Sequence, residues 1–279
     1  MGDSGHEQHG DLEVDRMGGR GARDVAVDLD SARRDRRTLD AAAVDVGDLT
    51  AAYAVQRALT SLRLARGGVI VGWKLGYTTA AMREQMAIDA PNYGPLLDSM
   101  QIHHGVLPVE LLQPRVEPEI ALVLAADPGR GASAQRVLAS CRRAVLALEV
   151  VDSVWSGYRF DLEHNTADGS SAAGYVLGEE IPLTATAVVV ELLVDTVAEH
   201  EGRTRAVLDG SGTLVAAADG VAWLADRLHE DGLQLRAGDV VLTGGLTRAT
   251  SVEPGSVARA HANGPGFSAN VSVQGAPRA

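Results

Sequence analysis

Three glutamates stand at positions where strands would bring their carboxyl groups together. In the first half of the segment 115–124, RVEPEIALVL, apolar and acidic residues alternate, so Glu117 and Glu119 point to one face of a strand. Glu149 is the only charged residue within the apolar run 144–151, and a buried carboxylate needs a partner. Mg²⁺ and Mn²⁺ take several oxygen ligands in proteins. The three glutamates therefore predict a site for one of these ions.

A second interpretation of the acidic pair needs no metal. Glu117 and Glu119 could lie on the wet face of an edge strand, and Pro118, which has no N–H to donate, favours an edge. The periodicity alone leaves both interpretations open. Glu149 favours the metal site, because it would otherwise be a buried and unpaired charge.

Lys74 is the only lysine in a chain with 25 basic residues, the others being arginines. A GC-rich coding bias explains the excess of arginine but not the exception. The pKa of a lysine can be lowered until the amine gives and takes protons, which a guanidinium does not do. Lys74 is therefore predicted to be catalytic. The alternative is that this lysine escaped replacement by arginine by chance.

The spacing of apolar residues predicts the elements that position these residues. Strands outnumber helices and do not alternate with them regularly, which favours an α+β fold with a curled, barrel-like or roll-like mixed β-sheet and flanking helices. Helices are predicted from an Asp48 cap to about 67, at 79–86, at 134–143 with Cys141 as a buried structural thiol, and at 220–229. Strands are predicted at 69–71 leading into Lys74, at 115–124, 145–152, 187–195 and 239–243, and on both sides of 263–266. A turn is predicted at 90–94, a solvated turn at 103–104, an irregular stretch at 153–170 and turns around Asp209.

The composition of the chain limits the classes of protein to which it can belong. The chain has 279 residues, 46% of them hydrophobic, and a net charge of −12, which suits a large folded core and offers no electrostatic footprint for nucleic acid. Residues 1–40, including the basic run 33–37, predict a disordered or loosely attached tail, and 41–279 predict a single catalytic domain. With neither a long apolar stretch nor a signal peptide, we expect a cytoplasmic protein that does not enter membranes.

The ordered set of motifs resembles a known family. GWKLGYTT, APNYGPL, RVEPEIALVL, ALEVVDS, TADGSS and VLTGGL follow one another as in the hydratase and decarboxylase branch of the fumarylacetoacetase superfamily. Its members are the 2-oxopent-4-enoate hydratases and the 4-oxalocrotonate (2-oxo-3-hexenedioate) decarboxylases. The resemblance covers about 45–274 and implies a metal-dependent lyase acting on a short 2-oxo-enoate.

The resemblance also implies roles for individual residues. Glu117, Glu119 and Glu149 would bind Mg²⁺ or Mn²⁺. Lys74, Ser171 and Asp168 are the expected catalytic group, and Asn92, Tyr93 and Gly94 are expected to bind substrate. We further expect a homo-oligomer, or a complex with a related hydratase or decarboxylase.

Departures from the family pattern put the activation of water in doubt, which favours decarboxylation over hydration. Hydratases of the family usually carry an aspartate, able to activate water, where this chain has Asn92, and an amide is no base. Relatives also commonly read A-D-N-A-S where this chain has Gly169 in the middle of ADGSS. The decarboxylase is therefore the first expectation and the hydratase the second. A partner subunit without turnover is the alternative outside enzymes.

Overall fold

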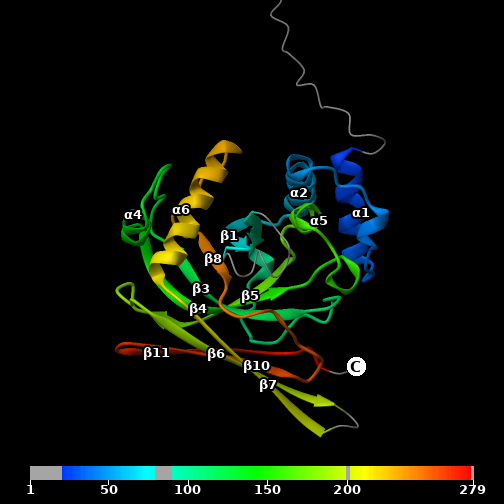
Figure 1. Cartoon of the computed structure of the whole chain (residues 1–279). Coiled ribbons are helices and arrows are strands. Elements are labelled where there is room, and N and C mark those ends of the chain that lie inside the picture. The colour runs from blue at the N-terminus through cyan, green and yellow to red at the C-terminus, as the bar shows by residue number, and fades with distance from the viewer. Residues whose placement is uncertain (1–20, 79–89, 199–201, 278–279) are drawn as a thin grey trace, which may run out of the picture.

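The computed structural model describes residues 21–78, 90–198 and 202–277. Two sheets are stacked, and helices cover the far side of the larger one (Figure 1). The larger sheet has the strand order β2-β1-β8-β3-β4-β5, with β9 also paired to β3; the smaller has the order β11-β10-β6-β7. β1 and β8 are parallel and the other pairs are antiparallel. This confirms the α+β class with a mixed sheet, and the described strands form no closed barrel.

The elements have these bounds. The larger sheet consists of β1 (Ile70–Gly76), β2 (Asn92–Leu97), β3 (Arg115–Leu124), β4 (Cys141–Val151), β5 (Ala172–Ile181), β8 (Val240–Gly245) and β9 (Thr250–Ser251). The smaller sheet consists of β6 (Val188–Ala198), β7 (Gly202–Gly212), β10 (Val257–Gly264) and β11 (Phe267–Gln274). The α-helices are α1 (Ala22–Arg34), α2 (Leu49–Leu64), α4 (Ala134–Ala139), α5 (Leu162–Ala167) and α6 (Leu214–Glu230), and short 3₁₀ turns are η1 (Ala41–Ala43), η2 (Asp98–Met100) and η3 (Ser156–Tyr158).

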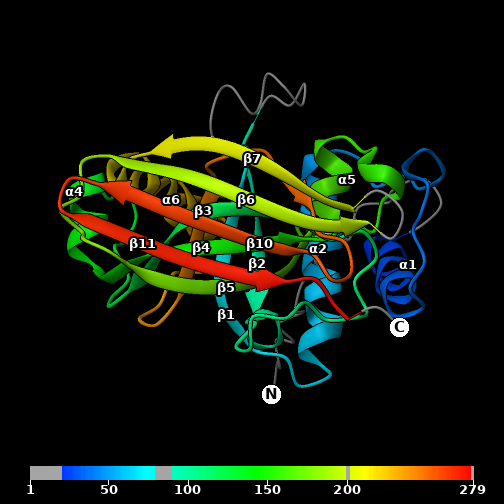
Figure 2. The ribbon, with the colours of Figure 1, turned by 90° about the horizontal axis from the view of Figure 1, so that it is seen from below.

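The main core fills the space between the sheets. Alternate residues of β10 and β11, such as Ala260 and Val271, are buried, whereas the residues between them face outward. The smaller sheet lies across β3, β4 and β5 (Figure 2). The two layers come so close at Gly178 that a Cβ there would lie 2.5 Å from the carbonyl oxygen of Asn270. The larger sheet is thereby held from one side and presents its other side to the helices.

The prediction of a tail over residues 1–40 is wrong from residue 22 onward. α1 is a helix that packs on α2, and Val25 and Leu29 are buried in a second core cluster together with Trp155. Its apolar residues are few and small, and six of its thirteen residues are charged, so its composition is that of a solvated segment. Residues 1–20 lie outside the described ranges.

Most of the predicted elements are confirmed with shifted ends. Asp48 caps α2 by accepting a hydrogen bond from Ala51 N at 2.9 Å, as predicted. The predicted turn at 90–94 is wrong in its second half, because β2 begins at Asn92. The helix predicted to 143 ends at Ala139, and Cys141, buried as expected, begins β4.

Three other predictions have separate outcomes. The helix expected at 79–86 lies outside the described residues. The stretch 153–170, expected to be irregular, contains α5. β7 includes Asp209, where turns were expected: this edge strand is rich in glycine and charge because only one of its sides is paired.

No helix in the described ranges is both long and apolar enough to cross a membrane.

Candidate active site

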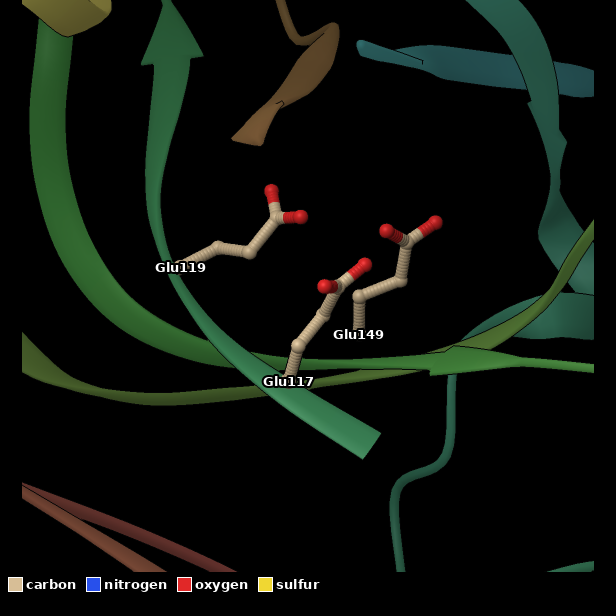
Figure 3. A group of neighbouring side chains, drawn as sticks. All are labelled: Glu117, Glu119 and Glu149. Carbon is tan, nitrogen blue, oxygen red and sulfur yellow. The ribbon is translucent and has the colours of Figure 1, made fainter. Parts of the chain in front are cut away.

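Glu117, Glu119 and Glu149 converge on one place, as the sequence predicts. The register of β3 and β4 sets Glu117 directly opposite Glu149, and Glu119 follows on the same face of β3. One carboxylate oxygen from each lies within 4.8 Å of the others. Figure 3 shows the three side chains rising from the two strands into a shared space. The geometry is that of a set of ligands for one cation.

The alternative of a wet edge strand is wrong. β3 lies between β8 and β4, and all three glutamates are buried, with exposed fractions of 9% or less. The carbonyl oxygen of Pro118 accepts a hydrogen bond from Leu246 N at 2.8 Å, at the point where β8 ends. The nitrogen and the carbonyl of one strand residue point to the same side, so the nitrogen of Pro118 faces this point too. Proline is therefore tolerated at this position. No ladder hydrogen bond is lost there.

The carboxylates have few partners of their own. Gly244 N donates to Glu119 Oε2 at 2.8 Å. Within the described part of the chain, Glu119 Oε1 and both oxygens of Glu149 receive no hydrogen bond of good geometry. Burial and the charge of Glu149 raise the pKa of Glu117 to about 8, and burial with the charges of Glu149 and Glu117 raises the pKa of Glu119 well above its usual range. Buried, mutually repelling oxygens with free lone pairs fit a divalent cation.

Lys74 completes the cluster from β1. Its Nζ lies 3.1 Å from Glu149 Oε1 and donates to the carbonyl oxygen of Ser170 at 3.0 Å and to Ser170 Oγ at 3.2 Å. Burial alone would lower its pKa, but the negative charges of the three glutamates outweigh burial and raise it. The pKa of Lys74 is thus raised as long as the charges of the glutamates are not neutralised. A bound dication would instead lower it.

The loop that faces Lys74 is held in a costly conformation. Ser170 and Ser171 have φ angles of 57° and 55°, in the left-handed region that residues with a side chain avoid. Such residues cost on the order of 1–3 kcal/mol each and persist only where the surroundings impose them. Ser170 N donates to Asn165 O at 2.8 Å, and Asp152 N donates to Ser171 O at 2.9 Å. The loop is therefore fixed before any substrate arrives.

Asn92 supports this loop from behind. Its Nδ2 donates to Asn165 Oδ1 at 2.9 Å and to Thr166 Oγ1 at 3.0 Å, and its Oδ1 accepts from Ser170 Oγ at 3.0 Å. Asn165 Nδ2 in turn donates to Ser171 Oγ at 3.0 Å. All polar groups of the Asn92 amide are thereby engaged. The chain of amides and hydroxyls sets both serine side chains.

Tyr93 and Gly94 also lie behind the loop. The Tyr93 ring stacks on Tyr53, with ring centres 4.8 Å apart, and its hydroxyl donates to Asp231. A Cβ on Gly94 would lie 2.2 Å from the carbonyl oxygen of Gly169, so only glycine allows the loop to approach β2 this closely. Substrate contact by residues 92–94 stays a prediction.

Asp168 is engaged in a buried ion pair. Arg33 Nη2 donates to Asp168 Oδ1 at 2.9 Å and to the carbonyl oxygen of Asp152 at 2.7 Å, and Nη1 donates to Asp152 Oδ2 at 3.3 Å. The other oxygen of Asp168 accepts from Val154 N at 3.0 Å. Arg33, assigned from sequence to a solvated tail, is therefore a partner of the loop. Asp168 is better placed to anchor the loop than to transfer protons.

A cavity of about 480 Å³ opens in front of the cluster. Lys74, Glu117, Ser170 and Ser171 lie on its wall with Asn165. Sequence reasoning missed the cavity's two arginines and its aromatic wall, although Arg115 shares a strand face with Glu117. These missed residues are Arg115, Tyr158, Phe160 and Arg248.

Comparison with known proteins finds relatives with two enzyme names, a hydratase and a decarboxylase. No protein-family model matches the chain. It is 37% identical over 229 residues to 2-keto-4-pentenoate hydratase of Burkholderia vietnamiensis strain G4, an alignment that covers 79% of this chain and 84% of the relative. It is 33% identical over 236 residues to 4-oxalocrotonate decarboxylase of Pseudomonas sp. strain CF600, covering 83% of this chain and 89% of the relative.

A solved structure extends the likeness to the fold. The 4-oxalocrotonate decarboxylase from Pseudomonas putida G7, complexed with magnesium and adipate, superimposes with a TM-score of 0.77 at 27% identity, over 91% of this chain and 97% of that one. A second structure of that enzyme holds calcium and acetate and gives a TM-score of 0.76.

Proposed function

Because the chain belongs to the hydratase and decarboxylase branch of the fumarylacetoacetase superfamily, we propose that it is a divalent-metal-dependent lyase that decarboxylates a 2-oxo-enedioate of the 4-oxalocrotonate type. The observation that carries the proposal is the convergence of Glu117, Glu119 and Glu149 with Lys74, a cluster whose Glu117 and Lys74 line one cavity. Three carboxylates that hold a dication, with one ammonium beside them, suit a reaction in which negative charge collects on a substrate oxygen.

The three glutamates would hold Mg²⁺ or Mn²⁺. Their oxygens without hydrogen bonds are hard ligands, and three protein ligands leave positions for a substrate that offers a carboxylate and a keto oxygen. The ion would polarise the keto group. Burial of the glutamates excludes water from their side of the site. The relatives' structures with magnesium and calcium support this assignment.

Lys74 would handle the proton. In decarboxylation the bond to the far carboxyl group breaks, CO₂ leaves, and the electron pair stays on the conjugated chain up to the keto oxygen. The Lys74 ammonium, fixed by Ser170 and Glu149, would give its proton to that oxygen and recover one from solvent. Ser171 would contact the substrate from the cavity wall.

The state of Asn92 favours decarboxylation over hydration. Hydration needs a base for water, and Asn92 is an amide whose polar groups are all engaged inside the protein. Decarboxylation needs no such base. The hydratase stays the second candidate, because relatives with that name are among the most similar proteins.

One experiment separates the two reactions. Protein loaded with Mg²⁺ is given 2-oxo-3-hexenedioate and 2-hydroxypenta-2,4-dienoate in turn, and CO₂ release and dienol absorbance are followed together. We expect CO₂ from the first substrate and slow loss of the second. Rapid hydration of the dienoate without CO₂ release from the enedioate would transfer the assignment to the hydratase.

Assembly and location are part of the same proposal. We infer a cytoplasmic enzyme, since the relatives bear the names of metabolic enzymes, and we propose that it forms a homo-oligomer or a complex with a related hydratase or decarboxylase. Light scattering of the purified protein, alone and mixed with such a relative, tests the assembly.

A further inference from the structure

The active-site cavity contains two cations that the proposed chemistry has not used. Arg115 and Arg248 both line it. Within the described ranges neither forms an ion pair with a carboxylate, whereas other arginines, such as Arg33 and Arg66, do. Arg115 instead lies over the ring of Tyr158, with its guanidinium carbon 3.8 Å from the ring centre. Two guanidinium groups without anions in one cavity indicate a bound anion.

The topology places both arginines beside the first half of β3. Arg115 begins β3 and precedes Glu117 by two residues, so their side chains share a face and their Cα atoms lie about 6.7 Å apart. β9 pairs with the start of β3, with Ser251 opposite Arg115. Thr250 lies opposite Val116, and Leu246 N donates to the carbonyl oxygen of Pro118, so Arg248 lies between these two contacts, alongside β3 near Glu117. The glutamates occupy the next stretch of the same face.

The space between the glutamates and Arg115 is suited to a short carbon chain. Val151 and Phe160 line the cavity together with Tyr158, and they offer apolar and aromatic surface. Arg115 and Glu117, the nearest glutamate, are two residues apart along β3. The distance between them is comparable with the length of a six-carbon dicarboxylate. A 2-oxo acid held by its keto end at the glutamates would thus direct its other end toward the arginines.

We propose that Arg115 and Arg248 form a subsite for the second carboxylate of the substrate, so that the site selects 2-oxo dicarboxylates over 2-oxo monocarboxylates. The proposal rests on the proposed function for the position of the 2-oxo end. Guanidinium groups bind carboxylates through paired hydrogen bonds, which makes them selective for such an anion.

The subsite has a kinetic consequence that sets it apart from the proton-transfer machinery. The carboxylate that it binds is the one that leaves as CO₂, so its charge is lost as the reaction proceeds. An interaction with that charge stabilises the bound substrate at least as much as the transition state, and its removal raises KM without lowering kcat. We expect Arg248→Met to have this effect.

The direct test measures binding without turnover. 2-Oxoadipate and 2-oxohexanoate have the same six-carbon chain and the same 2-oxo acid end, and they differ only in the second carboxylate. Both lack the double bond that would let CO₂ leave. Isothermal titration of the Mg²⁺-loaded protein should show 2-oxoadipate binding about 10- to 100-fold more tightly, the range for hydrogen bonds to a charged group.

Substitutions then assign the preference to the arginines. Arg115→Met and Arg248→Met should each reduce the preference for 2-oxoadipate, and the double variant should abolish it while 2-oxohexanoate affinity stays unchanged. Arg130→Met removes an exposed arginine outside the cavity and should leave both affinities unchanged. Should Arg115→Met fail to fold, Arg115→Lys keeps the charge but loses the paired hydrogen bonds and should retain only part of the preference.

The possible results are distinct. Equal affinity of the parent protein for the two acids, or a preference that survives in the double variant, would overturn the subsite. A preference that depends on the arginines, together with an absence of CO₂ release from the enedioate, would support the subsite and count against decarboxylation. Failure of both acids to bind would overturn both proposals.

Discussion

Lys74 carries the proton transfer in the proposed reaction, and its removal is the most direct test of the chemistry. Lys74→Arg keeps the positive charge beside Glu149 but cannot release a proton near neutral pH. We expect turnover of the enedioate to fall by about 10²- to 10⁴-fold, the usual contribution of a placed proton donor. Arg130→Lys, the reverse exchange at an exposed position, serves as the control. Turnover close to that of the parent protein in Lys74→Arg would exclude the proposed role.

Asn92→Asp tests the choice between the two lyases. A carboxylate at this position would face Asn165 Oδ1 and Thr166 Oγ1, where the amide now donates two hydrogen bonds. We expect the free energy of unfolding to fall by about 1–3 kcal/mol because buried acceptors lose their donors. CO₂ release should not rise. A large gain in hydration of the dienoate would instead identify a hydratase whose base is missing, and thermal melting with product analysis distinguishes these outcomes.

The acidic ligands could be predicted from the sequence because buried charges are rare. Glu149 stands alone in an apolar strand, and Glu117 and Glu119 alternate with apolar residues, so the types and spacing indicate the site. Arg115 and Arg248 could not be found in this way. Half-buried and exposed arginines, such as Arg115 and Arg248, are common in any chain, and only the pairing of β9 with β3 brings these two into one cavity.

α1 connects the first described residues of the chain to the active site. Arg33 on this helix binds Asp168 and Asp152, and these two residues precede and contact the strained Ser170–Ser171 loop. Arg33 is thus a positioning residue that acts through the loop. Its influence on the reaction should be measurable apart from its influence on folding.

We expect Arg33→Met to lower kcat at least about 10-fold at temperatures where the variant is fully folded, because the loop no longer holds the Lys74 contacts in place. Arg33→Lys should recover part of the loss. Arg34→Met on the same helix removes an ion pair with Asp30 that does not touch the loop, and should leave kcat unchanged. Equal kcat values in the Arg33 and Arg34 variants, measured by steady-state kinetics on folded protein, would assign Arg33 to stability alone.

The elements that sequence reasoning missed share a physical cause. α1 contributes alanines and two larger apolar residues to its core, and β7 is an edge strand with one unpaired side. Neither has the strong apolar period by which α2 and β4 could be predicted. Tertiary contacts, with α2 and with β6 respectively, decide their conformation.

The stability of the whole metal-free protein should depend on pH through its buried glutamates. The pKa of Glu117 is raised to about 8 in the folded protein, above its value of about 4.5 in an unfolded chain, so the folded state binds more protons between these values. The stabilisation is present at low pH and is lost as pH rises toward 8. With a chelator present, we therefore expect Tm to fall from pH 6 to pH 8.

Magnesium should reverse this loss, because it binds the ionised carboxylates and only the folded state presents them together. The rise in Tm on adding Mg²⁺ should be larger at pH 8 than at pH 6, as measured by calorimetry. Glu117→Gln removes one of the two glutamates whose pKa is raised and should weaken the pH dependence of the chelated protein. An unchanged Tm on addition of Mg²⁺ at either pH would contradict a metal site at these residues.

The parallel pairing of β1 with β8 also determines when the site can form during folding. Lys74 lies opposite Leu242, so its strand cannot be flanked on both sides until the last quarter of the chain has emerged from the ribosome. Contacts between such distant residues close slowly, because much chain entropy is lost before they form. We expect refolding chains to regain secondary structure first and metal-dependent activity later, and nascent chains that end before β8 to depend on chaperones that shield the exposed edge of β3.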